Sequence, residues 1–174
     1  PILSCRVLWR GLPQAQELLL ERGHRIDPAA IAAWWAERTG GTVGSRDGVS
    51  SVWIEGAAGF PYMFWVFNPV PEPKTVKNRV HWDVRLVDTT IDGLVAAGAT
   101  LLRPKDDEIR WWIMADPEGN EFCIIEPTNN FLSTCGRFGS ITCDGTREVG
   151  YFWSAALGWP LVWDQDDETA IRAP

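Results

Sequence analysis

Four side chains in the middle of the chain are of the types that bind metal ions or exchange protons. In residues 78–85 polar and apolar side chains alternate, so a strand there would place His81 and Asp83 on one face. The same alternation places Glu121 and Cys123 on one face of residues 121–126. An imidazole, two carboxylates and a thiol offer nitrogen, oxygen and sulfur donors, and three or four donors hold a divalent ion.

These residues also have simpler structural explanations. His81 can be a strand histidine that hydrogen-bonds to Asp83 or to a turn carbonyl. Cys123 can be a small, buried apolar residue. The polar residues of 116–120 are turn formers first. The sequence alone therefore assigns no catalytic residue.

Eleven tryptophans are the other unusual feature. A tryptophan buries a large area, so most of them should lie in the core. Helical spacing predicts that three of them face the core: Trp34, Trp35 and Trp153. Others lie on expected strands, among them Trp65 and the adjacent pair Trp111 and Trp112. One member of that pair should face a binding cleft, where its ring could stack on a planar ligand.

Residues 78–126 contain the elements that would position these side chains. After the strand 78–85, apolar residues at helical spacing and the stop signal Gly98 predict a helix over 88–97, with Asp88 or Thr89 as its N-cap. Three strands follow, at 100–103, 110–115 and 121–126. Pro117 and Gly119 suit the tight turn between the last two. The order predicts one βαβββ unit.

Similar patterns occur on both sides of this unit, because Asp27 and Asp144 also open helices that end at a glycine and lead into strands. The first copy has no clear first strand, and the third copy stops before its last strand. The expected domains are an uncertain segment 1–26, a domain 27–127 made of units 27–68 and 78–126, and a partial βαββ unit at 138–174.

Several motifs together resemble the glyoxalase-like branch of the vicinal oxygen chelate superfamily, which includes bleomycin-resistance proteins and many bacterial proteins. They are His81-Trp82-Asp83-Val84, the helix end Ala97-Gly98-Ala99, and the turn and strand of residues 116–123. The resemblance covers 27–126 and part of 138–174. It implies an α+β fold in which paired βαβββ units form a curled mixed sheet around a cleft.

The resemblance also implies a metal site with two ligands from each unit, one near the start of its first strand and one in its last strand. His81 has the first-strand position, and Cys123 stands where metal-dependent members have Glu. The expected strand 62–67 has no carboxylate or imidazole, and aligning the helix-ending glycines puts Ile141 at the position of His81. A complete family metal site is missing. No cofactor is expected, and a divalent metal bound by His81 and unidentified ligands is the alternative.

The composition and charge of the chain limit the classes of partner that we expect. With 174 residues, a charge of −7 and 45% hydrophobic residues, the chain has the profile of a soluble globular protein. Nucleic-acid binding normally uses a basic surface, which this charge argues against. No apolar run is long enough to span a membrane. The four cysteines have no CxxC spacing and predict reduced thiols in the cytoplasm.

Three functions stay open. The first is binding of a small planar organic ligand in an aromatic-lined cleft, with candidate contacts at His81, Asp83, Trp65, Trp111, Glu121 and Cys123. The second is a metal-dependent glyoxalase-type lyase or isomerase, or an extradiol-type dioxygenase, that uses His81. The third is an interaction module in which the half unit 138–174 is exchanged between chains. A homodimer is expected from the resemblance and from the exposed edge of an incomplete unit.

Overall fold

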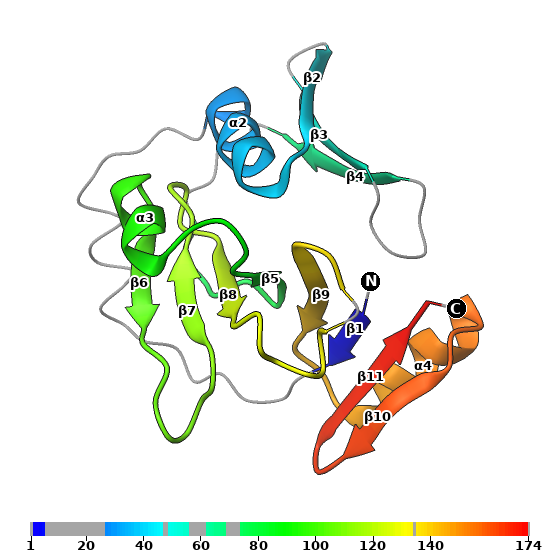
Figure 1. The fold of residues 1–174 in the computed structure, drawn as a ribbon. Helices are drawn as coiled ribbons and strands as arrows, with labels where there is room; N and C mark the ends of the chain where they lie inside the picture. Colours follow the sequence, from blue (N-terminus) through cyan, green and yellow to red (C-terminus); the bar gives the residue numbers. More distant parts are fainter. Residues whose placement is uncertain are drawn as a thin grey trace.

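The computed structural model describes residues 2–5, 27–46, 49–55, 62–68, 74–133 and 135–173. Within these ranges the strands form one eight-stranded and one three-stranded sheet, accompanied by three helices (Figure 1). In spatial order the large sheet contains β10 (Leu161–Gln165), β11 (Glu168–Arg172), β1 (Ile2–Cys5), β9 (Phe138–Cys143), β5 (Val80–Arg85), β8 (Glu121–Ile125), β7 (Trp112–Ala115) and β6 (Thr100–Arg103). The small sheet contains β2 (Thr42–Arg46), β3 (Val49–Glu55) and β4 (Tyr62–Phe67), and the helices are α2 (Pro28–Thr39), α3 (Ile91–Ala96) and α4 (Arg147–Leu157).

The second unit has the expected βαβββ order. It runs β5, α3, β6, β7, β8, and β8 lies parallel to β5 and antiparallel to β7. The helix begins later than expected, because its N-cap is Thr90, whose hydroxyl accepts a hydrogen bond from the amide of Gly93 at 3.0 Å. The turn before β8 has Gly119 at φ 83°, the left-handed conformation that favours glycine.

The third unit pairs with the second in a way that the sequence did not predict. We expected the sheets of units 27–68 and 78–126 to pair, but the strand that pairs with β5 from outside the second unit is β9, in antiparallel register. The tail was expected to lack a last strand, yet β1 lies parallel to β9 and antiparallel to β11. In the third unit β1 therefore occupies the position that β8 occupies in the second unit. A strand from one end of the chain thus completes a unit at the other end.

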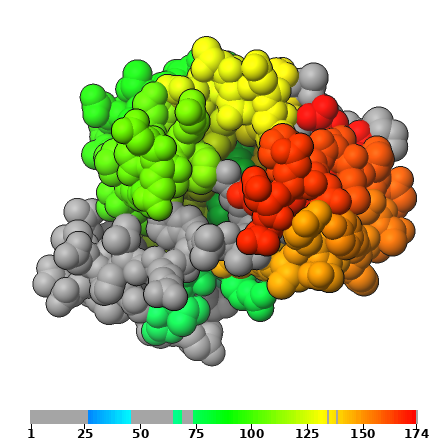
Figure 2. Space-filling model, turned by 90° about the horizontal axis from the view of Figure 1, so that it is seen from below, coloured from blue at the N-terminus to red at the C-terminus, as the bar shows by residue number. Residues whose placement is uncertain are grey.

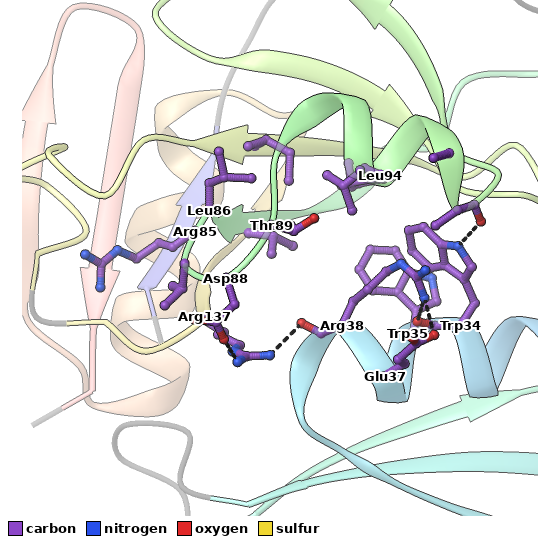
Figure 3. A pocket seen from close by; sticks show the side chains of 17 residues that line it. Trp34, Trp35, Glu37, Arg38, Arg85, Leu86, Asp88, Thr89, Leu94 and Arg137 are labelled. Atoms are coloured by element: carbon purple, nitrogen blue, oxygen red, sulfur yellow. Dashed lines mark hydrogen bonds and ion pairs between the residues drawn. The ribbon is translucent and has the colours of Figure 1, made fainter.

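The first unit packs through its helix. Asp27 caps α2 by accepting from the amide of Ala29 at 3.0 Å, and Gly40 ends the helix at φ 73°. The helix lies on the α3 side of the large sheet, which we call the helix side. The core there includes Ile31, Trp35, Trp65, Val84, Leu94, Met114, Phe122 and Ile124. The sequence prediction that Trp34 and Trp35 face the core is confirmed. Between α2 and α3 this packing leaves a cavity of about 620 Å³ (Figure 3).

We call the opposite side of the large sheet the inner face. A second core lies there, formed by Ile109, Ile113, Cys123, Ile125, Leu132, Cys135 and Ala170, with Leu102, Trp111 and Phe131 packed against it. This core includes residues of the connection from β8 to β9 together with Ala170 of β11, so it joins the second and third units. Figure 2 shows a hollow between the second unit, in green, and the third unit, in orange to red. The arrangement is that of a curled sheet.

The packing of α4 contradicts one prediction. Trp153 was expected to face the core, but Trp153 is 38% exposed and its neighbour Phe152 is 62% exposed. The helix instead turns Gly150 toward β11, where an added Cβ would clash with the Thr169 side chain. Tyr151 also donates a hydrogen bond to Asp164 of β10 at 3.0 Å. The apolar side of α4 is therefore exposed on the surface of the described part of the chain. No helix within the described residues is long and apolar enough to cross a membrane.

Candidate functional site

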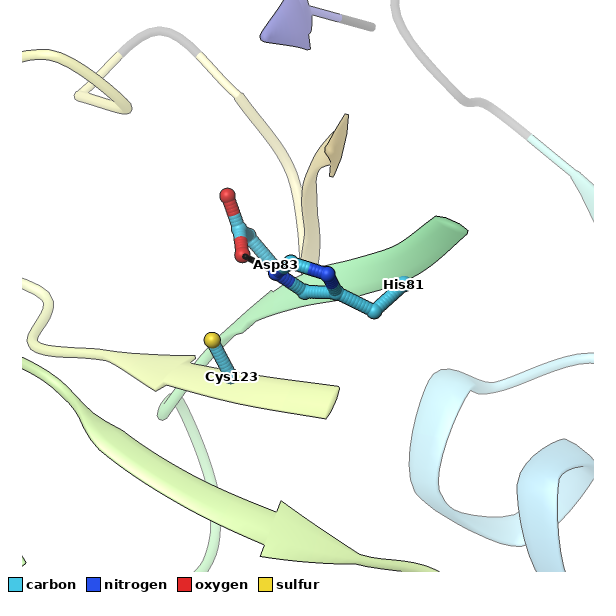
Figure 4. Close-up of side chains that lie close together, drawn as sticks. All are labelled: His81, Asp83 and Cys123. Atoms are coloured by element: carbon cyan, nitrogen blue, oxygen red, sulfur yellow. Dashed lines mark ion pairs between the residues drawn. The ribbon is translucent and has the colours of Figure 1, made fainter. Parts of the chain in front are cut away.

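Three of the predicted site residues meet on the inner face of the large sheet. Asp83 of β5 and Cys123 of β8 are partners in the parallel register, so their side chains project from adjacent strands on the same side. His81 precedes Asp83 by two positions and shares that side. Their ligand atoms all lie within 4.8 Å of one another (Figure 4). Nothing else in the described ranges groups three such residues in this way.

Two hydroxyl groups from β9 fix the carboxylate of Asp83. Ser140 and Thr142 donate hydrogen bonds to its Oδ2 at 2.7 and 2.8 Å. The other oxygen, Oδ1, is 3.6 Å from Nε2 of His81, an ion pair when the imidazole is protonated. Such outer contacts orient a carboxylate toward whatever its second oxygen binds.

The surroundings of the cluster are apolar. His81 is 9% exposed and Cys123 is 4% exposed, and Cys123 belongs to the inner core together with Ile113 and Ile125. Low exposure to water strengthens electrostatic attraction between a bound cation and the carboxylate. It also makes an unpaired charge costly, so a cation and the carboxylate would compensate each other.

The metal ion implied by the resemblance fits this donor set. Imidazole, carboxylate and thiolate are the ligands that zinc and similar ions take in proteins. Three protein ligands leave coordination positions for a small molecule, as in catalytic zinc sites. Three donors gather at this point among the described residues, and the neighbouring strand β9 contributes the two hydroxyls that bind Asp83. The aligned residue Ile141 alternates with Ser140 and Thr142 on β9.

The other predicted site residues, Glu121, Trp111 and Trp65, differ in their surroundings. Glu121 accepts from Lys74 Nζ at 2.8 Å and from the amide of Asn78 at 3.1 Å, so it anchors the segment that leads into β5. Trp111 packs on the inner core. Trp65 is on the helix side instead, where it is buried and stacked on Trp82 with ring centroids 4.3 Å apart. It is part of the core there.

Sequence reasoning missed Ser140 and Thr142. The alternation of polar and apolar residues over 138–143 could have placed both on one face of a strand. It could not show that this strand is the neighbour of β5, because strand pairing depends on contacts far apart in the sequence.

The βαβββ unit, its pairing with a second unit and the donor cluster at their junction define a class of α+β protein. A family model for the Glyoxalase-like domain matches residues 24–125, and the chain belongs to this family. The resemblance to the vicinal oxygen chelate superfamily is thereby confirmed. Neither the curated proteins nor the solved structures contain a significant match to the chain. The family match spans the first and second units, whereas sheet hydrogen bonds join the second unit to the third.

Proposed function

We propose that the protein binds a small organic molecule on its inner face, at a divalent metal ion held by His81, Asp83 and Cys123. One observation carries the proposal: the nitrogen, oxygen and sulfur donors of these residues lie within 4.8 Å of one another. Ser140 and Thr142 also donate to the carboxylate of Asp83, which fixes the orientation of one of the three donors.

The donor set favours particular metals. Thiolate and imidazole together suit zinc and other late transition ions better than magnesium or calcium, which prefer oxygen ligands. When bound, such an ion acts as a Lewis acid toward oxygen atoms of the small molecule. Its charge would favour the thiolate form of Cys123 and the neutral form of His81.

The residues around the ion would shape the ligand. Trp111 and Phe131 pack on the same inner core and offer flat apolar surfaces to a planar molecule. Asp83, held by Ser140 and Thr142, would keep its second oxygen on the ion. With a metal, the reaction classes are those of a glyoxalase-type lyase or isomerase, or an extradiol-type dioxygenase.

Binding of an organic ligand without metal is the second candidate. It is favoured by the contact between His81 Nε2 and Asp83 Oδ1 at 3.6 Å, which lets the two side chains satisfy each other when His81 is protonated. The cluster would then be a polar recognition element in a binding protein.

Elemental analysis separates the two candidates. Protein purified without chelators or metal-binding tags is dialysed against Zn²⁺, Ni²⁺, Mn²⁺ and Fe²⁺ in turn, and the bound metal per chain is measured. We expect close to one zinc ion per chain, lost in His81→Ala and in Cys123→Ala. Cys135→Ala is the matched control, because Cys135 is another buried thiol of the inner core outside the cluster. A wild-type chain that stays folded without metal under every condition supports the metal-free candidate.

A further inference from the structure

A second site lies on the other side of the large sheet, in the cavity between α2 and α3. Its volume of about 620 Å³ is within the roughly 300–1,000 Å³ typical of pockets for small molecules. Val84, Leu94 and Phe122 line it, all members of the helix-side core, and neither His81 nor Cys123 does. The sheet itself separates this cavity from the donor cluster.

One wall of the cavity is a fixed aromatic surface. The indole Nε1 of Trp34 donates to the carbonyl of Ala97 at 2.8 Å, which holds the ring in place. Trp35 meets it edge to face, with ring centroids 5.0 Å apart. The guanidinium of Arg38 lies 4.2 Å from the Trp34 ring centroid and donates to the carbonyl of Trp34 at 2.8 Å. Ring and cation are therefore positioned before any ligand arrives.

The charged residues that line this cavity are Arg38, Arg85 and Arg137 together with the acidic Glu37 and Asp88. Arg38 forms an ion pair with Glu37 at 3.0 Å. The guanidinium of Arg85 donates to the carbonyls of Cys135 and Pro127, so Arg137 is the cation that a ligand in the cavity could use. Figure 3 shows Arg137 between Asp88 and the end of α2, where Arg137 donates to the carbonyl of Arg38 at 3.2 Å. A guanidinium is matched in shape to a carboxylate, which it can bind through two parallel hydrogen bonds.

The ion pair between Arg137 and Asp88 is exchangeable. The side chain of Asp88 is 58% exposed and that of Arg137 is 35% exposed. Exposed ion pairs of this kind contribute little to stability, so an incoming carboxylate could replace Asp88 at little cost. The backbone contact from Arg137 to Arg38 would still hold the guanidinium over the cavity.

We propose that this cavity is a binding site for a small aromatic carboxylate. Its ring would lie against the Trp34 surface and the apolar floor of Leu86 and Leu94, and its carboxylate would bind Arg137 in place of Asp88. The site is independent of the metal cluster on the inner face.

Calorimetric titration with a matched pair of probes tests the proposal. Indole-3-acetate carries a ring and a carboxylate, and indole-3-acetamide differs by the missing charge. We expect indole-3-acetate to bind one site per chain at least about tenfold more tightly than the amide, because a charge-assisted bidentate contact is lost in the amide. Arg137→Gln should remove this preference, while Arg147→Gln, an exposed arginine on α4, should keep it.

Two further variants make the outcome decisive. Ala96→Trp places a bulky ring at an exposed lining position without removing a core contact, and we expect it to weaken both probes at least about tenfold. His81→Ala should leave binding unchanged, whether or not the inner face holds a metal. The proposal is overturned if folded protein gives no saturable heat with millimolar indole-3-acetate, if both probes bind equally, or if Ala96→Trp has no effect.

Discussion

At the scale of single residues, the hydroxyls of Ser140 and Thr142 decide how Asp83 can be used. Both donate to Oδ2, at 2.7 and 2.8 Å, and so turn Oδ1 toward His81. Removing both in Ser140→Ala/Thr142→Val should lower zinc affinity by about 10- to 100-fold, the usual effect of losing outer contacts to a metal ligand. Competition with a fluorescent chelator measures it.

The control for this variant is Ser133→Ala, since Ser133 is exposed and its hydroxyl donates to the carbonyl of Asn130. Unchanged zinc affinity in the double variant would show that the hydroxyls do not orient the carboxylate.

Asp116 is a buried carboxyl that links the β7–β8 turn to α2. It accepts from Trp35 Nε1 at 3.0 Å and from the amides of Glu118 and Asn120 at 3.0 and 2.9 Å. Burial raises the pKa of Asp116 above its ordinary value of 3.8, although these hydrogen bonds favour the charged form. The native state therefore keeps this proton to a higher pH than the unfolded state does.

The sign of the resulting pH effect follows from linkage. Between the pKa of Asp116 in the unfolded state and its higher pKa in the native state, the native state binds more protons. The contribution of Asp116 to the free energy of unfolding is therefore fully present below pH 3.8 and falls as the pH rises through the native pKa. Asp116→Asn removes this titration and places an amide nitrogen opposite a donor. We expect Asp116→Asn to lower the free energy of unfolding by about 1–3 kcal/mol at acid pH. The difference from the wild-type protein should narrow as the pH rises. Urea unfolding over a pH series measures it, with the exposed Asp107→Asn as control. A gap that widens with pH would contradict the assignment.

Local sequence patterns were enough to bring part of the site together. Alternation along 78–85 placed His81 and Asp83 on one face, and the position after the turn placed Cys123 in the next strand. Trp65 shows the limit of such patterns. It lies on a strand as expected, but burial against Trp82 on the helix side depends on how the first unit packs, which no local signal encodes.

At the scale of elements, α2 and α4 each carry a pair of adjacent aromatic residues at the same distance from the glycine that ends the helix, but in different surroundings. Trp34 and Trp35 lie six and five positions before Gly40, and Phe152 and Trp153 lie six and five before Gly158. The rings of each pair meet edge to face at 5.0 and 5.1 Å. Only the α2 pair is covered, by the second unit, so the two pairs should differ in their contribution to stability.

Alanine substitutions measure this difference. Trp35→Ala should lower the free energy of unfolding by about 3–5 kcal/mol, since it empties a packed site. Trp153→Ala should lower it by about 1 kcal/mol, because much of that ring is in water. Urea unfolding monitored by circular dichroism measures both. An equally large, concentration-dependent loss for Trp153→Ala would mean that a second copy covers α4 in solution, as the expected homodimer would allow.

Several element boundaries were predictable because their signals are local, although α4 was expected to begin at Asp144 and has Thr146 as its N-cap. Asp27-Pro28 marks the start of α2, and glycines in the left-handed conformation end α2 and α4. The same local spacing made Trp153 look like a core residue. Spacing gives the apolar side of a helix and leaves open whether anything covers it.

At the scale of the whole molecule, the sheet is assembled from distant parts of the chain. The pairing of β5 with β9 and the insertion of β1 between β9 and β11 are long-range choices. The repeated pattern predicted three units, and the family match covers the first two. Which units share a sheet follows from backbone edges that must find partners. Strand β9 follows β8 in the chain after the connection 126–137 and pairs with β5.

The place of β1 can be tested through two cysteines. Cys5 and Cys143 are Cα partners in the parallel register of β1 and β9, and neighbouring strands lie about 4.8 Å apart. A short bismaleimide should therefore link these residues in a Cys123→Ser/Cys135→Ser background. We expect a product of monomer mass whose linked peptides contain Cys5 and Cys143. Leu3→Pro should abolish it, because proline removes a ladder donor from a strand that is paired on both sides.

The mass of the linked product decides how the third unit is completed. A monomeric product that forms in Leu3→Val and not in Leu3→Pro means that each chain closes its own unit. A product of twice the chain mass, persisting on dilution, means that β1 enters the unit of a second copy, because exchange of an identical strand keeps every backbone pairing. The interaction role expected from the half unit would then be realised through β1. If the folded Cys123→Ser/Cys135→Ser protein gives no linked product, β1 does not lie between β9 and β11.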